Sequence, residues 1–213
     1  MAGLRRPKQT RAERLAAEKR KARALEDHEI IAVWNACEGS YGNIIRLLLL
    51  TGTRRSEIAK LSRDRILSDR IVLPPTHTKT GEKHEVPLTD FMRTIIAAQP
   101  VTTSKLVFAS EKTGRAFNNW GKAIAELQRA AGVKFTPHDL RRTCRTLMSR
   151  LGVEHDIAEL AIGHQRVGLD RLYNFDQAWQ LRCDAFAKVS DHVALLGRAT
   201  DEGKVVAIPA RTY

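Results

Sequence analysis

The longest apolar run of the sequence, residues 44–50, limits what this chain can fold into more than any other feature. It reads Ile-Ile-Arg-Leu-Leu-Leu-Leu, so that Arg46 interrupts it, whereas a membrane-spanning helix needs about 20 apolar residues. A run of this length that is followed by Gly52 predicts a helix buried inside a domain. The chain has 213 residues, of which 43% are hydrophobic, and this is enough for one domain with an extensive core.

Apolar residues elsewhere mostly follow the 3.6-residue spacing of helices. The first such segment starts at Asp27, which we expect to cap it, and is broken at Gly39. Strand-like runs at residues 70–75 and 83–88, with turn residues between them, predict an antiparallel hairpin, and a third strand is expected at residues 106–109. Further helices are predicted at residues 41–50, 54–61, 91–98, 118–131, 137–151 and 176–196. The predicted fold class is therefore α+β, mainly α-helical, with a small antiparallel β-sheet in the N-terminal third.

Positive charge is concentrated at the N-terminus. The chain carries 36 Lys and Arg against 24 Asp and Glu, a net charge of +12. Residues 1–23 hold nine Lys and Arg against two Glu, which is +7 of this total. We interpret residues 1–24 as a basic linker or arm, and two readings stay open: a solubilising linker, or an arm that lies along phosphates. The candidate phosphate-binding residues are Arg5, Arg6, Lys8, Arg11, Arg14, Lys19, Arg20, Lys21 and Arg23.

Several classes of function lack their sequence signatures. The three cysteines are far apart and form no CxxC pair, which argues against a disulfide framework and for a reducing cytoplasm. No GxxxxGK[ST], GxGxxG or HExxH motif occurs, so neither a nucleotide-phosphate loop nor a zinc-protease site is indicated. The basic N-terminus has no apolar segment after it and is not a secretory signal. The positive charge favours a polyanionic partner, although the aromatic content of 6% gives no stacking platform of the kind that RNA-binding modules use.

Two local patterns in the first half of the chain carry residues suited to chemistry. A turn at Gly52 opens a short helix with Arg54 in its first turn, where the helix N-terminus and the guanidinium both favour an anion. Glu57 either holds an arginine in place or is an ordinary acid of a first helical turn. Lys79 lies at the turn of the hairpin, where a lysine is usually solvated. It can give a proton to a leaving alkoxide if the turn enters a groove.

Two more patterns follow in the second half. His138 and Arg141 share one face of a helix by their i,i+3 spacing, so that an imidazole and a guanidinium can converge on one anion. A zinc site built from His138 and His164 would lack a third ligand. Tyr173 stands nine residues after His164. A phenol is a poor nucleophile unless cations stabilise its anion, and taken singly each of these patterns also occurs as a helix cap or a basic surface.

Together the patterns resemble the catalytic domain of the tyrosine recombinase (phage integrase) family in order, spacing and residue type. The motifs that carry the resemblance are Thr51-Gly-Thr-Arg54-Arg-Ser-Glu57, Lys79-Thr-Gly, His138-Asp-Leu-Arg141-Arg, Gly163-His164 and Tyr173. The resemblance covers about residues 25–196, which would form the catalytic domain. Residues 197–213 would then be a C-terminal tail that packs in cis or on a neighbouring protomer.

The resemblance implies a role for each matching residue. The implied catalytic set is Arg54, Lys79, His138, Arg141, His164 and Tyr173, with Glu57 as a supporting acid. Tyr173 would attack a DNA phosphorus to form a 3′-phosphotyrosine link, while Arg54 and Arg141 clamp the phosphate oxygens. Lys79 would protonate the leaving 5′-oxygen. His138 would assist proton transfer at Tyr173, and His164 would donate a hydrogen bond to the phosphate.

The resemblance also implies the partners and setting of the reaction. The implied partners are double-stranded DNA and accessory DNA-bending or directionality proteins, and the protein would act as an oligomer on DNA (a tetrameric synapse in the family). The implied location is cytoplasmic and nucleoid-associated, with no membrane. No metal, cofactor or ATP is implied. Family members usually carry a core-binding domain before the catalytic one, and about 24 residues precede it here. We therefore expect a catalytic-domain fragment of a longer integrase, or a minimal one. The alternative is a catalytically idle DNA-binding module.

Overall fold

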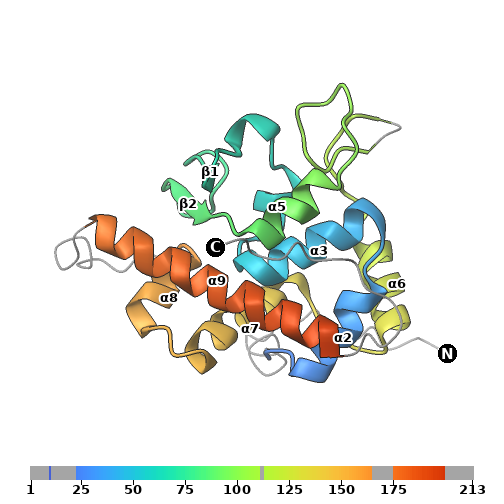
Figure 1. The fold of residues 1–213 in the computed structure, drawn as a ribbon. Coiled ribbons are helices and arrows are strands. Elements are labelled where there is room, and N and C mark those ends of the chain that lie inside the picture. Colours follow the sequence, from blue (N-terminus) through green and yellow to red (C-terminus); the bar gives the residue numbers. More distant parts are fainter. Residues whose placement is uncertain (1–9, 11–22, 111–112, 165–174, 200–213) are drawn as a thin grey trace.

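The computed structural model describes residues 10, 23–110, 113–164 and 175–199, and within them helices predominate (Figure 1). The elements are α2 (Asp27–Ala36), α3 (Gly39–Thr51), α4 (Arg55–Ala59), the 3-10 turn η1 (Arg63–Arg65), β1 (Arg70–Leu73), β2 (His84–Pro87), α5 (Asp90–Ala97), α6 (Trp120–Ala131), α7 (Pro137–Arg150), α8 (His155–Ala161) and α9 (Phe175–Ala199). The predicted class, mainly helical with a small antiparallel sheet, is confirmed.

Helix α3 forms the centre of the domain. Every residue from Leu47 to Thr51 is buried, and the helix contacts α7, α5, α4 and α9. Arg46, which interrupts the apolar run, is half-buried and donates hydrogen bonds to the carbonyl oxygens of Trp34 and Cys37. Its charge is therefore accommodated at the edge of the core. Within the described residues, no helix is long and apolar enough to cross a membrane.

Strands β1 and β2 form the hairpin predicted from the sequence. Ile71 pairs with Val86, and both side chains are fully buried. Their neighbours Val72 and Glu85, which pair with each other, are half-buried. This alternation is typical of a strand pair with one face against the core.

The predicted third strand at residues 106–109 is wrong. The segment makes isolated bridges between Ser62 and Leu106 and between Ala109 and Ala116, and it joins no ladder in the described residues. The chain that follows Ser62 coils into η1. The segment therefore has no extended neighbour long enough to continue a ladder of hydrogen bonds.

Two helix starts also differ from the sequence-based expectation. Glu26 rather than Asp27 caps α2, in a capping box with Glu29. Asp27 instead pairs with Arg150 of α7 at 2.9 Å, and this hydrogen bond lowers the pKa of the Asp27 carboxyl. Gly39, expected to break the first helix, is the first residue of α3. Helix α8, of seven residues, is absent from the helices predicted from the sequence.

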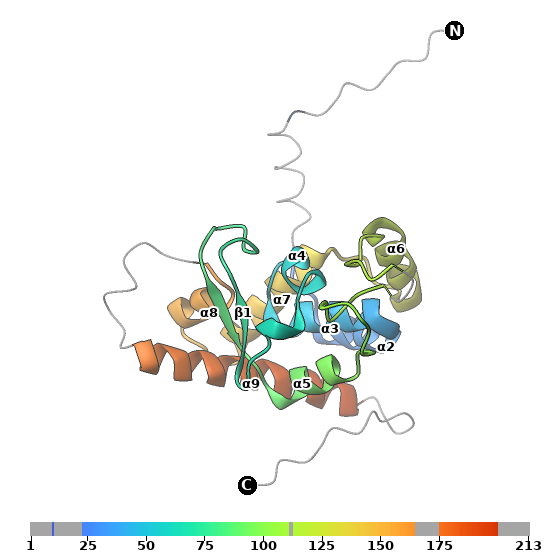
Figure 2. The same ribbon diagram turned by 90° about the horizontal axis from the view of Figure 1, so that it is seen from above.

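Helix α9 lies across one face of the domain and packs against α8, α2, α7, α3 and β2 (Figures 1 and 2). Its side chains Phe186, Val189 and Val193 are buried. Near its start, the Trp179 ring lies under the guanidinium of Arg70 from β1, at 3.9 Å from the ring centroid, a cation–π contact. The helix is thus fixed to the hairpin at one end and to the helical core along its length.

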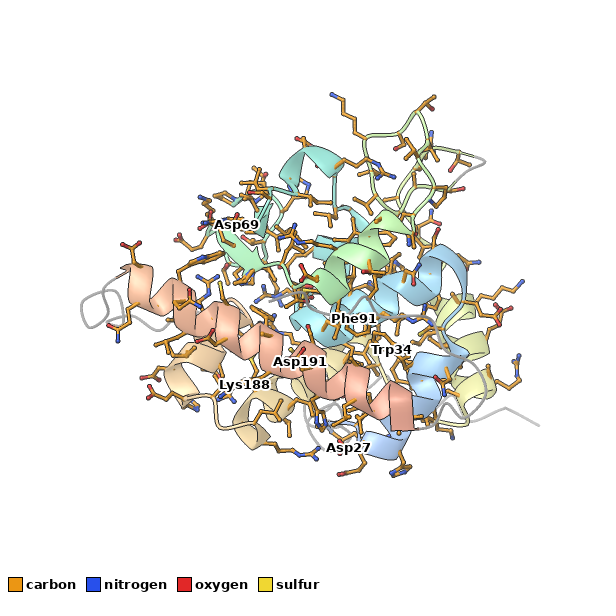
Figure 3. The ribbon with its side chains drawn as sticks, in the orientation of Figure 1. Asp27, Trp34, Asp69, Phe91, Lys188 and Asp191 are labelled. Carbon is orange, nitrogen blue, oxygen red and sulfur yellow. The ribbon has the colours of Figure 1, made fainter. Side chains whose placement is uncertain are left out.

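Helices α2 and α5 meet through two aromatic rings. Trp34 and Phe91, labelled in Figure 3, have ring centroids 5.2 Å apart at an interplanar angle of 30°. Both side chains pack against the buried core. Such offset contacts between rings add to the burial of their area, and they close the side of the core formed by these two helices.

Candidate active site

The turn after α3 places Arg54 at the start of α4. Gly52 ends α3 in the left-handed conformation, with φ 61°, where an L-residue is strained. A Cβ atom at Gly52 would lie 2.8 Å from Cγ2 of Ile162 and 3.2 Å from Sγ of Cys144. Both the conformation and the close packing therefore require glycine here. Arg54 follows as the N-cap residue of α4.

Glu57 holds Arg54 from within the first turn of α4. Its Oε2 accepts a hydrogen bond from the backbone nitrogen of Arg54 at 2.7 Å, and its Oε1 accepts one from Nη1 of Arg54 at 3.0 Å. The Glu57 side chain is 1% exposed and that of Arg54 is 23% exposed. The contact favours the interpretation in which Glu57 holds the arginine in place rather than serving as an ordinary surface acid.

Arg141 of α7 lies beside the same turn. Its Nη1 donates to the carbonyl oxygen of Gly52 at 2.6 Å, and the residue is 3% exposed. Burial and, after it, the charge of Arg54 lower the pKa of Arg141 to about 10, so that the side chain stays cationic at neutral pH. Its Nη2 is buried and has no hydrogen-bond partner among the described residues. A buried N–H group without an acceptor is unfavourable, and this position therefore suits an anion.

His138 lies at the first turn of α7. Thr136 caps this helix by accepting a hydrogen bond from the backbone nitrogen of Asp139, and Pro137 begins it. Partial burial and then the positive charges of Arg142 and Arg141 lower the pKa of His138. The imidazole thus lies close enough to Arg141 for the charge of the guanidinium to act on it, as the i,i+3 spacing predicts.

One hollow of about 350 Å³ brings His138 and Arg141 together with His164. His138 and Arg141 line it from α7, and Glu159, Ile162 and His164 line it from α8 and the turn that follows. The lining also includes Arg23, Ala24, Arg142, Arg145 and Thr146. Guanidinium and imidazole groups outnumber the single carboxylate in this wall. This hollow, the cationic hollow, is therefore suited to a phosphate group.

Arg54 does not line this hollow, but its charge reaches the groups that do. It contributes to lowering the pKa of both Arg141 and His138. The structure thus brings Arg54, Arg141, His138 and His164 into one region. These are four of the six positions in the predicted catalytic set.

Lys79 is exposed on the loop between β1 and β2, and within the described residues its ammonium group makes no hydrogen bond or ion pair. Burial and then the charges of Arg65 and of Lys60, the C-cap residue of α4, lower the pKa of His77 in this loop. In Figure 2 the loop and α4 lie at the same edge of the domain. The structure thus places the loop that carries Lys79 at the same edge of the domain as α4, the helix that Arg54 caps.

Several predicted residues lie outside the described ranges. Tyr173 is one, and so are the candidate phosphate-binding residues from Arg5 to Lys21. Arg23, the last of that set, is described. Its Nη1 pairs with Glu29 at 2.6 Å and its Nη2 donates to the carbonyl oxygen of Lys134. Arg23 is thus held by the folded domain, one step before the predicted boundary at residue 24.

His84 is a residue of this region that the sequence analysis missed. It begins β2, is 8% exposed, and its Nε2 lies 3.0 Å from the carbonyl oxygen of Ala161. Burial and then the charge of Arg182 lower the pKa of His84 to about 4, so that it is neutral at pH 7 and donates to Ala161. No local spacing indicated this contact, which joins the hairpin to α8.

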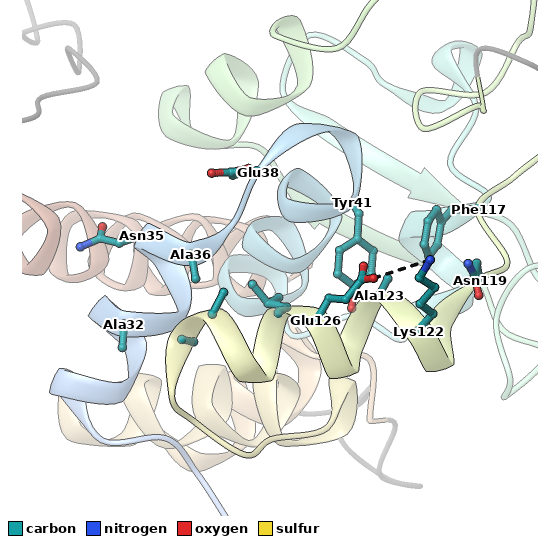
Figure 4. A pocket seen from close by; sticks show the side chains of 13 residues that line it. Ala32, Asn35, Ala36, Glu38, Tyr41, Phe117, Asn119, Lys122, Ala123 and Glu126 are labelled. Carbon is teal, nitrogen blue, oxygen red and sulfur yellow. Dashed lines mark ion pairs between the residues drawn. The ribbon is translucent and has the colours of Figure 1, made fainter.

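The described residues hold no group of three or more His, Cys, Asp or Glu side chains that could bind a metal ion. A second hollow, of about 790 Å³, lies between α2, the start of α3 and α6 (Figure 4). Tyr41, Phe117 and several alanines line it, with Lys122 and Glu126 paired at 3.8 Å on its rim. It shares no lining residue with the cationic hollow.

A model of the phage integrase family matches residues 23–178, which is most of the chain. The chain belongs to the phage integrase family. The matched range of this integrase-family domain contains the Gly52 turn, the hairpin, α7 and α8. It also contains every residue that lines the cationic hollow. The family resemblance seen in the sequence motifs is confirmed.

One curated relative and two solved structures are also similar to this chain. The tyrosine recombinase XerA of Saccharolobus solfataricus is 26% identical over 160 residues, which are 73% of this chain and 53% of that protein. This integrase-family chain thus spans about half the length of that relative. The lambda integrase catalytic core has a similar fold, with a TM-score of 0.54 at 18% identity over 67% of this chain and 96% of that chain. The integrase from mycobacterium phage Brujita matches with a TM-score of 0.64 at 16% identity, over 90% of this chain and 65% of the other.

Proposed function

We propose that this domain cleaves and rejoins DNA strands through a covalent 3′-phosphotyrosine intermediate at Tyr173. The observation that carries the proposal is the state of Arg141. Its guanidinium is almost fully buried next to the charge of Arg54, and one of its nitrogens lacks an acceptor among the described residues. A phosphate diester in the hollow would supply the missing acceptor and the missing negative charge.

The reaction follows from the chemistry of the proposed residues. The phenol oxygen of Tyr173 attacks the phosphorus, the bond from phosphorus to the 5′-oxygen breaks, and the 5′-hydroxyl leaves. Negative charge builds on the non-bridging oxygens in the transition state. Arg54 and Arg141 are the donors for these oxygens, and preorganised donors of this kind contribute several kcal/mol. Attack of another 5′-hydroxyl on the phosphotyrosine link reverses these steps and rejoins the strand without ATP.

The remaining polar residues have proposed roles in proton transfer and positioning. His138 assists removal of the phenol proton from Tyr173, and Lys79 gives a proton to the leaving 5′-oxygen. His164 donates to the phosphate. Glu57 keeps the Arg54 guanidinium in place through its contacts with both the side chain and the backbone of that residue. Because guanidinium groups supply the positive charge, we expect cleavage to persist in the presence of a metal chelator.

The proposed partner is double-stranded DNA, bound by an oligomer of this chain. The basic arm of residues 1–24 follows the phosphate backbone, residues 25–196 act as the catalytic unit, and the tail from residue 197 packs on its own or a neighbouring protomer. Helix α9 continues through Ala199, so the first three residues of the predicted tail belong to that helix and the rest would start after it. Accessory DNA-bending or directionality proteins are further candidate partners.

A nicked suicide substrate tests the proposed function. Cleavage next to the nick releases a short strand, which diffuses away and leaves the covalent adduct trapped. We expect an adduct between protein and DNA on a denaturing gel with the wild type, and none with Tyr173→Phe. Tyr213→Phe is the matched control, since it makes the same chemical change elsewhere in the chain. An adduct that forms equally well with Tyr173→Phe would overturn the assignment of the nucleophile.

The same experiment separates the alternative function. A wild-type protein that binds DNA in a salt-dependent manner but forms no adduct on any nicked substrate would be an idle DNA-binding module. Binding is measured in parallel by the shift of a labelled duplex on a native gel. The Tyr173→Phe variant should bind like the wild type, because the phenol oxygen is needed for chemistry and not for holding the duplex.

A further inference from the structure

Glu159 makes a contact with His164 that the reaction scheme above does not use. Its Oε2 lies 2.7 Å from Nδ1 of His164. Both residues line the cationic hollow, and the His164 side chain is 47% exposed while that of Glu159 is 17% exposed. The carboxylate therefore lies on the inner side of the ring, and Nε2 is the ring nitrogen left for a ligand.

Arg145 of α7 holds this carboxylate in place. Its Nε donates to Oε1 of Glu159 at 2.7 Å, its Nη1 donates to Oγ of Ser149, and its Nη2 lies 2.8 Å from Nδ1 of His155. Burial raises the pKa of Glu159, but the hydrogen bonds from Arg145 and His164 outweigh it, so that the pKa is lowered overall. All three arms of the guanidinium are occupied inside the protein, and Glu159 is an ionised acceptor at neutral pH.

The backbone around His164 is fixed as well. The His164 nitrogen donates to the carbonyl oxygen of Glu159 at 2.9 Å. Gly163 has a φ of 75°, and a Cβ atom there would lie 2.9 Å from Nδ1 of His84. The main chain and the side chain of His164 are thus both tied to Glu159, and the ring has little freedom to turn its other nitrogen inward.

We propose that Glu159 is a positioning residue for His164, which accepts the Nδ1–H of the ring and so presents Nε2 to the phosphate. An ionised carboxylate has no proton to donate, so the ring must carry its proton on Nδ1 when it is neutral. When a second proton is added, it is located on Nε2 and can be donated to a non-bridging phosphate oxygen. The proposal rests on the proposed function, but the orientation of the ring can be measured without it.

The tautomer of His164 is the first test. Nitrogen NMR of protein labelled at histidine distinguishes a ring protonated at Nδ1 from one protonated at Nε2, and the His164→Gln spectrum assigns the signal. We expect the Nδ1–H form in the wild type, whereas histidine in water prefers the Nε2–H form. In Glu159→Gln this preference should be lost, because an amide can donate as well as accept. Glu126→Gln, the same change on the exposed face of α6, should leave the signal unchanged.

Single-turnover cleavage is the second test. Carboxylate partners of functional histidines in metal sites typically contribute about 10–100-fold, and we expect the cleavage rate constant of Glu159→Gln to fall about tenfold, at the low end of that range. DNA affinity should stay near the wild-type value. Glu126→Gln again serves as the control for the rate.

The outcomes of the two tests are distinguishable. An Nε2–H tautomer in the wild type, or a wild-type rate and tautomer in Glu159→Gln, would overturn the positioning role while the proposed function stands. A wild type that forms no adduct would overturn the proposed function, and the tautomer would still decide the orientation of the ring. The wild-type measurement does not depend on the folding of any variant.

Discussion

Replacing Gly52 by alanine is the sharpest test of how the arginine site is built. The left-handed backbone conformation of an L-residue costs about 1–2 kcal/mol. The added Cβ would also meet Cγ2 of Ile162 at 2.8 Å and Sγ of Cys144 at 3.2 Å, and overpacking of a core typically costs about 1–3 kcal/mol. We expect Gly52→Ala to lower the free energy of unfolding by about 2–5 kcal/mol in all.

Gly132→Ala is the matched control for this change. Gly132 ends α6 with a φ of 67° and a ψ of 12°, close to the 61° and 13° of Gly52, but nothing lies within 4 Å of a Cβ built on it. Urea denaturation of both variants separates the two terms, and the control should lose about 1–2 kcal/mol. Equal losses in the two variants would refute the packing argument.

The same variant tests the link between the turn and Arg141. The carbonyl oxygen of Gly52 accepts the hydrogen bond from Nη1 of Arg141, so a shift of the turn should move that guanidinium. We expect single-turnover cleavage by Gly52→Ala to fall at temperatures where the variant is fully folded, and cleavage by Gly132→Ala to remain at the wild-type level. A folded Gly52→Ala protein with an unchanged rate would show that Arg141 does not depend on this turn.

Arg54→Ala and Arg141→Ala should each lower the rate of cleavage by about 10²–10³-fold and lower DNA affinity far less; equal losses in rate and in binding would make them ordinary phosphate contacts. Removal of residues 1–22, which hold eight Lys and Arg, should reduce the slope of log affinity against log salt by up to about seven, and an unchanged slope would show that the arm does not lie on DNA. The pKa of His84 falls from 6.5 to about 4 in the folded state, so the unfolded chain takes up the proton first as the pH falls. The contribution of His84 to the free energy of unfolding should therefore be complete above pH 6.5 and should decline by up to about 3 kcal/mol towards pH 4. Urea denaturation across this range should show a steeper pH dependence for the wild type than for His84→Gln. Identical slopes would contradict this reasoning.

Features formed by residues that are near each other in the chain could be predicted from the sequence. Gly52, Arg54 and Glu57 are neighbours along the chain. The glycine that ends α3 and the acid in the first turn of α4 follow from the preferences of helix ends, and Arg54 stands between them. The hairpin could be predicted because its two strands are joined by turn residues. His138 and Arg141 share a helix face because of the geometry of the helix itself.

Contacts between distant segments could not be predicted in the same way. Arg141 reaches the carbonyl oxygen of Gly52 across 89 positions, and His84 reaches Ala161 across 77. A helix period shows which face is buried but not which carbonyl it meets. The same limit explains the false third strand at residues 106–109, where the composition suits a strand but pairing depends on a partner elsewhere.

Arg54 and Arg141 lie close enough for the charge of Arg54 to lower the pKa of Arg141. Two like charges are held near each other before any phosphate arrives, one by a buried carboxylate and the other by a main-chain carbonyl. The electrostatic work of assembling this pair is therefore done once, when the chain folds, and is not repeated in each catalytic cycle. A chain with an apolar residue in place of Arg141 should fold to a more stable but inert protein, since a buried charge lowers stability when its partner is absent.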